Sequence, residues 1–390
     1  MSLNLVFADD LTGACEIAGI AHRAGLRTHL SMDPETAPVD PAELVVVDTE
    51  TRLLSAAHAA ARIQYFATEL PSDCRLFKKT DSVLRGPVAA ETAALARHLQ
   101  RDLTLLVPAN PAFSRHIVGG HYRIGTEPLH RTPFGRDPLN PITTDAVVDI
   151  LGEWDGPGPA EPRSLPPHGE LPSAGLVIGD TADVRDLQAW ARRVSPATLP
   201  AGGGAFFTEL LQPVPLATPA PPPPLDAPTL LLSGTTIPAQ RALLQNSPDA
   251  VPLSLDELSR RGDTALTNWR QRVLRQVRRN NRALVYVEGE VSPDPSTPGR
   301  ITCAHAFLAE CLAASFDHKP WHLFIEGGAT AAAIASALGR RRFGVRHAWG
   351  PGVVTLQPVT GPFPLFTLKP GSYPWPAPLH QHFFPTPSRG

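Results

Sequence analysis

The sequence lacks several features that would place it in a common class. Its four cysteines include no CxxC pair, so neither a zinc ribbon nor a thioredoxin-like redox motif is predicted. No apolar run approaches the ~20 residues of a membrane-spanning helix, and the first ten residues lack the basic and apolar regions of a secretion signal. We therefore expect a cytoplasmic protein without membrane contact, whose cysteines are buried free thiols.

A basic surface and the familiar nucleotide fingerprints are missing as well. The formal net charge is −2, which argues against nucleic acid as a main partner. Neither a GxxxxGK[ST] loop nor a GxGxxG turn after a strand occurs, and the second absence argues against a dinucleotide-dependent oxidoreductase. Any site for an anion must therefore be local and of another type.

Proline is abundant, with 44 residues in a chain of 390. The segment 213–228 is rich in proline and almost uncharged, so it should be an extended, semi-rigid tether of about 3.1 Å per residue. It predicts two lobes, 1–212 and 229–390, with a ligand cleft between them.

Short apolar runs alternate with helical patterns in both lobes, which is typical of parallel sheets covered by helices. We expect an α/β fold with two lobes, each with a mainly parallel sheet flanked by helices. Strands are expected at 3–8, 44–48, 76–78, 103–107, 176–179, 229–232, 283–287 and 323–325. The Pro- and Gly-rich segment 108–145 should be a long loop, and structureless loops of this length are usually functional or disordered.

Two polar clusters follow expected strands of the first lobe. Residues 78–86 read KKTDSVLRG, and residues 9–14 read DDLTGA. Arginine offers a planar fork for a carboxylate or phosphate, and lysine offers a point charge. A charged turn would also explain either cluster alone. Ligands of parallel sheets bind at the carboxyl ends of strands, so the shared placement predicts a site.

The second lobe holds glycine turns of similar placement. Ser233-Gly234-Thr235 leaves one expected strand, residues 326–331 (EGGATA) leave another and open a helix, and residues 369–372 read KPGS. Glycines let backbone N–H groups approach a phosphate at a helix N-terminus. Ordinary tight turns are the alternative for each.

Together these motifs resemble the four-carbon acid sugar kinase family, long catalogued as a domain of unknown function. Residues 9–14 are similar to its DDxTGA motif, and residues 79–86 to its KxDSTLRG motif with Val83 in place of threonine. Further similar segments are 108–111 with Arg115, Gly120, Tyr122 and Asp137-Pro138; Asp180 with Asp183; 233–235 with Gln240; 327–331; 351–352; and 369–371.

The resemblance implies an acid-sugar-binding domain, a nucleotide-binding domain, and ATP- and Mg²⁺-dependent phosphorylation of erythronate, threonate or an oxo-tetronate. The catalytic candidates are Asp10, Asp81 and Arg85. The substrate-binding candidates are Asp9, Asp10, Thr12, Lys79, Asp81, Ser82, Arg85, Arg115 and His121. The cofactor-binding candidates are Ser233, Gly234, Thr235, Gly327, Gly328, Thr330, Gly352 and Gly371. No metal ligand is assigned, and a homo-oligomer is compatible with the sequence.

Some alternatives remain open. Asp9 could be a helix-capping carboxylate and His121 an ordinary loop histidine. Ala329 stands where the family usually has an acidic residue, and Pro370 and Tyr373 replace small residues. A degenerate protein that binds acid sugar or nucleotide without transfer is therefore the alternative function.

Overall fold

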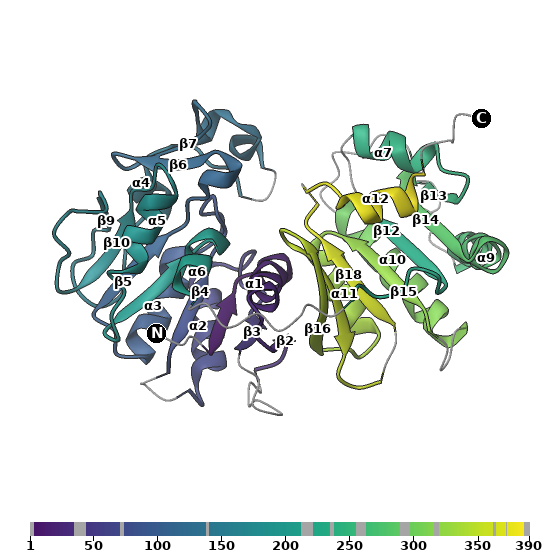
Figure 1. Ribbon diagram of the computed structural model, residues 1–390, viewed down its shortest axis with the longest axis horizontal. Coiled ribbons are helices and arrows are strands. Elements are labelled where there is room, and N and C mark those ends of the chain that lie inside the picture. The colour runs from purple at the N-terminus through teal and green to yellow at the C-terminus, as the bar shows by residue number, and fades with distance from the viewer. Residues whose placement is uncertain are drawn as a thin grey trace. The chain divides into compact units, whose positions relative to one another are not determined.

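The computed structural model divides into two compact units, Met1–Ala217 and Thr218–Gly390, and the division falls within the predicted tether. The described residues are 4–34, 44–70, 74–137, 140–211, 221–234, 238–254, 263–288, 297–315, 320–361, 364–371 and 373–385 (Figure 1).

The first unit contains a parallel sheet of short, buried, largely apolar strands. Its order is β2 (Thr28–Ser31), β3 (Leu44–Asp48), β1 (Leu5–Ala8), β4 (Leu76–Lys79), β11 (Thr198–Gly202), β5 (Leu103–Val107), β10 (Gly175–Gly179) and β9 (Arg163–Leu165). Every neighbouring pair in this series is parallel. The predicted parallel sheet is confirmed.

Helices cover both faces of this sheet. Right-handed crossovers place α1 (Leu11–Arg23) and α5 (Val184–Ala191) on one face, because each leads back toward the β2 edge. The same rule places α2 (Ala56–Ala67) and α3 (Val88–His98) on the other face. Accordingly, α6 (Gly204–Leu210) packs against both α1 and α5, and α2 packs against α3 (Figure 1). The Ser55 side chain accepts a hydrogen bond from the His58 N–H and so caps the start of α2.

The strand order reverses at β1, since β3 lies on one side of it and β4 on the other. The loops that follow β1 and β4 therefore diverge at a topological switch point, where parallel α/β sheets bind ligands. The two polar clusters of the first lobe occupy these two loops.

The segment 108–145 has more regular structure than a long loop. It forms a small antiparallel sheet of β6 (Arg115–Val118), β7 (His121–Ile124) and β8 (Glu127–Pro128), with 3₁₀ turns at Pro111–Phe113, Leu129–Arg131 and Pro133–Arg136. Tyr122 and Leu129 are fully buried in the core of the unit. The short helix α4 (Val147–Leu151) follows.

The second unit has a mixed sheet in the order β13 (Ala250–Ser254), β14 (Arg282–Glu288), β12 (Thr229–Ser233), β15 (His322–Glu326), β18 (Leu365–Lys369), β17 (Val353–Pro358) and β16 (Arg342–Gly350). The first five strands are parallel. Strands β16 and β17 extend the sheet in antiparallel fashion and were not anticipated.

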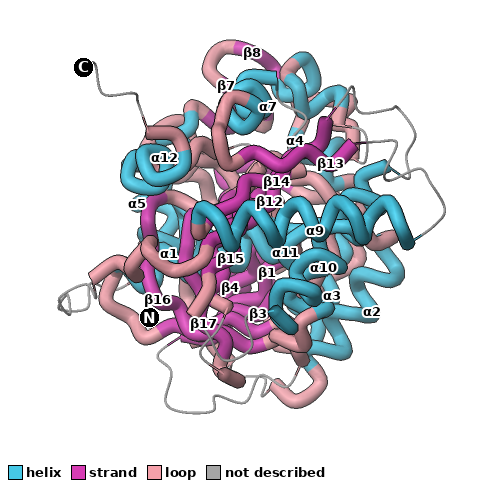
Figure 2. Tube along the Cα trace, turned by 90° about the vertical axis from the view of Figure 1, so that its right-hand side faces the viewer, coloured by secondary structure: helices cyan, strands magenta, loops and turns pink. Residues whose placement is uncertain are grey.

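The helices of the second unit also lie on two faces. Helices α9 (Asp263–Asn280), α10 (Thr297–Ser315) and α11 (Gly328–Ala337) pack in one layer (Figure 2). Helices α7 (Pro238–Gln245) and α12 (Ala377–Phe383) contribute Leu244, Leu379 and Phe383 to a core cluster on the opposite face. No helix within the described ranges is long and apolar enough to cross a membrane.

The expectation of buried cysteines is wrong for one residue. Cys15 is buried and Cys74 is partly buried, but Cys303 is exposed. Cys303 lies on the outer surface of α10, where a thiol adds nothing to the core.

Candidate functional site

The aspartates that follow β1 are held by an arginine that follows β3. The Arg52 guanidinium donates to both oxygens of Asp9 at 2.8 and 2.9 Å and to both oxygens of Asp10 at 2.5 and 2.8 Å. Its Nη2 also lies 3.9 Å from Asp81 Oδ1. Burial alone would raise the pKa of Asp9, but Arg52 holds that pKa below its usual range. Asp9 is therefore ionised at neutral pH.

Asp10 has little acceptor capacity left. Besides Arg52, it accepts hydrogen bonds from the Gly13 backbone N–H at 2.7 Å and from the Thr12 hydroxyl. It caps α1, so the capping role considered for Asp9 belongs to Asp10. A carboxylate with all its lone pairs engaged orients its neighbours rather than accepting another proton.

The cluster that follows β4 is organised around a second ion pair. Arg85 donates to Asp81 through Nε at 2.9 Å and Nη2 at 3.0 Å, and to Asp137 through Nη1 at 2.9 Å. Asp81 also accepts from the backbone N–H groups of Val83 and Arg85. Burial opposes ionisation of Asp81, but Arg52 and Arg85 hold its pKa far below the usual range. Arg85 is thus neutralised by two carboxylates.

The lysines of this cluster are buried and paired. Lys79 Nζ lies 3.2 Å from Glu16 Oε2, and Lys78 Nζ lies 2.5 Å from Glu91 Oε2. Burial would lower the pKa of Lys79, but Glu16 and the nearby aspartates hold it above its usual value. Lys79 therefore carries its charge at neutral pH.

The small sheet brings a further cation to the cluster. Arg115 Nη1 donates to the Ser82 hydroxyl, and the Tyr122 hydroxyl donates to the Ser82 carbonyl at 2.6 Å. His121 precedes Tyr122 on β7, so its side chain points to the opposite face. It is exposed and lies 3.4 Å from Asp145. The structure thus joins Arg115 to the candidate group and leaves His121 outside it.

Arg52 is the functional candidate that the sequence analysis missed. It lies in the loop after β3, at the same edge as the clusters after β1 and β4. Extending the strand-end argument to the third strand would have found it. β3 itself ends on Asp48, which is fully buried; burial raises its pKa well above the usual range and favours its neutral form.

In the second unit, three strand ends form a compact polar group. The Ser233 hydroxyl donates to Glu326 Oε2, and Trp375 Nε1 donates to Glu326 Oε1 at 2.8 Å. Lys369 Nζ lies 3.4 Å from Glu326 Oε1 and 5.5 Å from the centre of the Trp375 ring. Burial lowers the pKa of Lys369, and Glu326 opposes this. Ser233, Glu326 and Lys369 end β12, β15 and β18, which are adjacent in the sheet, and Trp375 precedes α12.

The predicted glycine turns meet around this group. Gly327 has φ +98° and precedes α11, and its N–H donates to the Lys369 carbonyl at 2.9 Å. Gly352 has φ +66°, and a Cβ there would lie 3.0 Å from Pro370. Gly371 accepts a hydrogen bond from Lys369.

The remaining cofactor candidates lie at the same edge or outside the described part. Gly328 and the buried Thr330 lie in the first turn of α11, and Gly234 directly follows β12. Thr235 lies outside the described residues. The first turn of α11 has neither an acidic residue nor a side-chain cap, so its backbone N–H groups are available to an anion.

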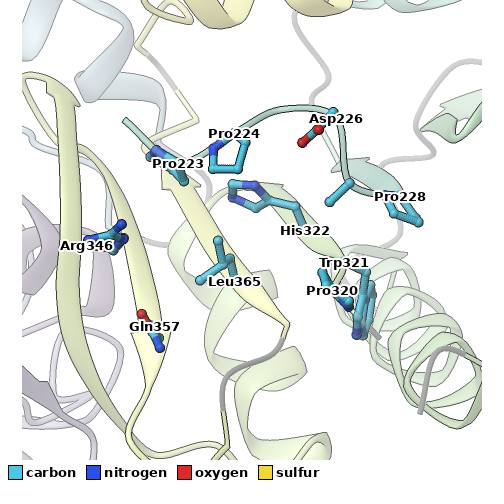
Figure 3. Close-up of a pocket in the computed structure, with 11 residues that line it drawn as sticks. Pro223, Pro224, Asp226, Pro228, Pro320, Trp321, His322, Arg346, Gln357 and Leu365 are labelled. Carbon is cyan, nitrogen blue, oxygen red and sulfur yellow. The ribbon is translucent and has the colours of Figure 1, made fainter. Parts of the chain in front are cut away.

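A separate pocket lies at the other edge of this sheet. Its volume is about 620 Å³, and it lies beside the amino ends of β12, β15 and β18 (Figure 3). It is lined by Pro223, Pro224, Asp226, Ala227, Pro228, Pro320, Trp321, His322, Arg346, Gln357 and Leu365. Burial lowers the pKa of His322 to about 3, so its imidazole is neutral. Because the pocket lies beside the amino ends of these strands, it is distinct from the glycine turns at their carboxyl ends.

Comparison with known proteins gives relatives along the whole chain. Residues 4–210 match the family model described as the sugar-binding N-terminal domain. A D-threonate kinase of Cupriavidus necator is 30% identical over 376 residues, covering 90% of this chain and 89% of the relative. A 3-oxo-tetronate kinase of Methylobacterium radiotolerans is 31% identical over 211 residues, covering 51% of this chain and 47% of the relative.

Solved structures share the fold. A Salmonella typhimurium protein superposes with a TM-score of 0.74 at 18% identity, covering 96% of this chain and 97% of its own. A Haemophilus influenzae protein from a family of unknown function gives 0.69 at 20% identity, covering 97% and 98%. These likenesses confirm the two-lobed α/β architecture along nearly the entire chain.

Proposed function

Because this chain belongs to the four-carbon acid sugar kinase family, we propose that it transfers the terminal phosphoryl group of ATP to a hydroxyl of a tetronate such as threonate, erythronate or 3-oxo-tetronate. The observation that carries the proposal is the D-threonate kinase that aligns with 90% of the chain. On this proposal, the ligands of this protein are a small acid sugar and ATP.

We assign acid-sugar binding to the switch point of the first unit, domain 1–212. Arg115, Ser82 and Lys79 would contact the substrate. Phosphoryl transfer depends mainly on positioning and charge stabilisation rather than on a strong base. Asp10 and Asp81 would serve in positioning, because their oxygens hold Arg52 and Arg85 in place. Asp9 keeps one acceptor position on each oxygen and would orient the attacking hydroxyl.

We assign nucleotide binding to the carboxyl edge of the second unit, domain 229–390. The uncapped N-terminus of α11, with Gly327 and Gly328, fits a triphosphate because its N–H groups and helix dipole favour an anion. Mg²⁺ usually takes one or two protein carboxylates together with phosphates and water, and Glu326 with Ser233 supplies such oxygens. Bound there, Mg²⁺ would neutralise charge on the phosphates.

Turnover of ATP with a panel of tetronates tests the proposal. We expect ADP formation that depends on the acid sugar and on Mg²⁺, and little activity with neutral tetritols of the same length. Binding of a tetronate without ADP formation, in protein that also binds ATP, would instead support the non-catalytic alternative.

Ala329 offers a test of the nucleotide site by itself. It lies in the first turn of α11, where family members usually carry an acidic residue. We expect Ala329→Asp to tighten binding of MgATP severalfold relative to ATP without metal, because the carboxylate adds an oxygen ligand. Titration of the variant with each nucleotide form measures this. Equal changes for both forms would show that position 329 does not face the metal.

A further inference from the structure

The cations of the acid-sugar site differ in how they are neutralised. Arg52 pairs with Asp9 and Asp10, Lys79 with Glu16, and Arg85 with Asp81 and Asp137. Within the described part of the chain, no carboxylate pairs with Arg115. Arg115 is partly buried, and its Nη1 donates to the neutral Ser82 hydroxyl. It is therefore the guanidinium of this group whose charge remains for a ligand.

Aromatic rings hold Arg115 in position. Its guanidinium lies 5.6 Å from the centre of the Phe134 ring and 5.9 Å from that of Phe113. The Arg85 guanidinium lies 5.3 Å from the same Phe134 ring. Cation–π contacts of this kind orient a guanidinium without neutralising its charge. Phe134 thus fixes Arg115 relative to the Asp81–Arg85 pair.

One short turn, residues 132–137, carries both Phe134 and Asp137. Thr132 Oγ1 accepts from the Phe134 N–H at 3.3 Å, which begins the turn. A Cβ at Gly135 would lie 1.9 Å from the His130 carbonyl oxygen, so only glycine permits this backbone path. The turn therefore fixes two things together, the aromatic support of Arg115 and the carboxylate that neutralises Arg85.

We propose that Asp137 is a specificity-determining residue, which occupies Arg85 and so leaves one unneutralised cation in the acid-sugar site. The inference rests on the proposed function and deepens it. A monocarboxylate pairs with Arg115. A dicarboxylate on the same four-carbon skeleton has to place its second charge near Arg85, where Asp81 and Asp137 already balance the guanidinium charge and repel a further carboxylate. The site therefore selects monocarboxylic acid sugars.

The test compares threonate with tartrate, in which a second carboxylate replaces the terminal hydroxymethyl group. Dissociation constants are measured by calorimetry without ATP, so that a failure of catalysis leaves this test intact. In Asp137→Asn, the amide oxygen can still accept from Arg85 Nη1, but the second carboxylate charge beside Arg85 is gone. We expect the ratio of the tartrate to the threonate dissociation constant to fall about tenfold, which corresponds to ~1.4 kcal/mol.

Three further variants make the result specific. Asp145→Asn removes a carboxylate of the same segment that pairs with His121 and His130, and the ratio should stay at the wild-type value. Phe134→Leu should weaken threonate binding while binding of the neutral tetritol changes little, and Phe134→Tyr should restore it. An unchanged ratio in Asp137→Asn, with a melting temperature near that of the wild type, would overturn the proposal.

Discussion

Replacement of Arg52 by alanine should both destabilise the first unit and slow phosphoryl transfer strongly. The guanidinium is the shared partner of Asp9 and Asp10 and lies near Asp81. Without it, the buried carboxylate of Asp9 loses its ion-pair and hydrogen-bond partner and keeps only the weaker attraction of Lys78 and Lys79. Removal of one partner from a buried pair costs about 3–5 kcal/mol. We expect a loss of that size in the free energy of unfolding, and a fall in kcat/KM of ~10²-fold or more.

The pH dependence of stability should change sign in this variant. In the wild type, Arg52 keeps the pKa of Asp9 below its unfolded value. This group therefore contributes stability above the unfolded pKa, and the contribution is lost as the pH falls through the folded pKa. In Arg52→Ala, burial, the largest single influence on this group, should outweigh the remaining attraction of Lys78 and Lys79 and raise the pKa of Asp9. Stability should then decline as the pH rises above the unfolded pKa.

Arg185→Ala is the matched control for Arg52→Ala. Arg185 forms an exposed ion pair with Asp183 at 3.8 Å, and such pairs contribute about 0–1 kcal/mol. Denaturant unfolding at several pH values compares the two variants. If Arg52→Ala were as stable as Arg185→Ala across this range, the pairing of Arg52 with Asp9 and Asp10 would contribute nothing to the free energy of unfolding.

The position of the candidate site was predictable from the sequence because parallel sheets bring strand ends to one edge. The clusters after β1 and β4 follow two adjacent parallel strands, at the carboxyl edge where the switch point lies. The turns after β12 and β15 likewise directly follow adjacent parallel strands and lie at one edge of the sheet. Local patterns suffice where the functional group directly follows a strand.

Contacts between distant segments could not be read from the sequence in this way. The position of Arg52 after a strand indicates the edge at which it lies, but its pairing with Asp9 and Asp10 depends on β3 lying beside β1, which the local sequence does not specify. Arg115 reaches Ser82 across 33 positions of chain, through a small sheet whose strands are only two to four residues long. Strands β16 and β17 were missed because their pairing is antiparallel within an otherwise alternating pattern.

In the second unit, Lys369→Met should have the largest effect. The ammonium group is buried beside Glu326 and donates to the carbonyls of Pro370, Gly371 and Tyr373. Methionine keeps most of the volume but leaves Glu326 without its cation, which should destabilise the unit by about 3–5 kcal/mol. We also expect ATP to bind at least tenfold more weakly by titration, while threonate binding to the first unit is unchanged.

The double variant Lys369→Met/Glu326→Gln separates the two roles of the lysine. Glutamine removes the uncompensated buried charge, so the melting temperature should recover. The carbonyls of residues 370, 371 and 373 still lack their common donor, so the loop that follows β18 is no longer held beside Gly327 and Gly352, and weak ATP binding should persist. Recovery of ATP affinity together with stability would show that Lys369 acts on the nucleotide solely by neutralising Glu326.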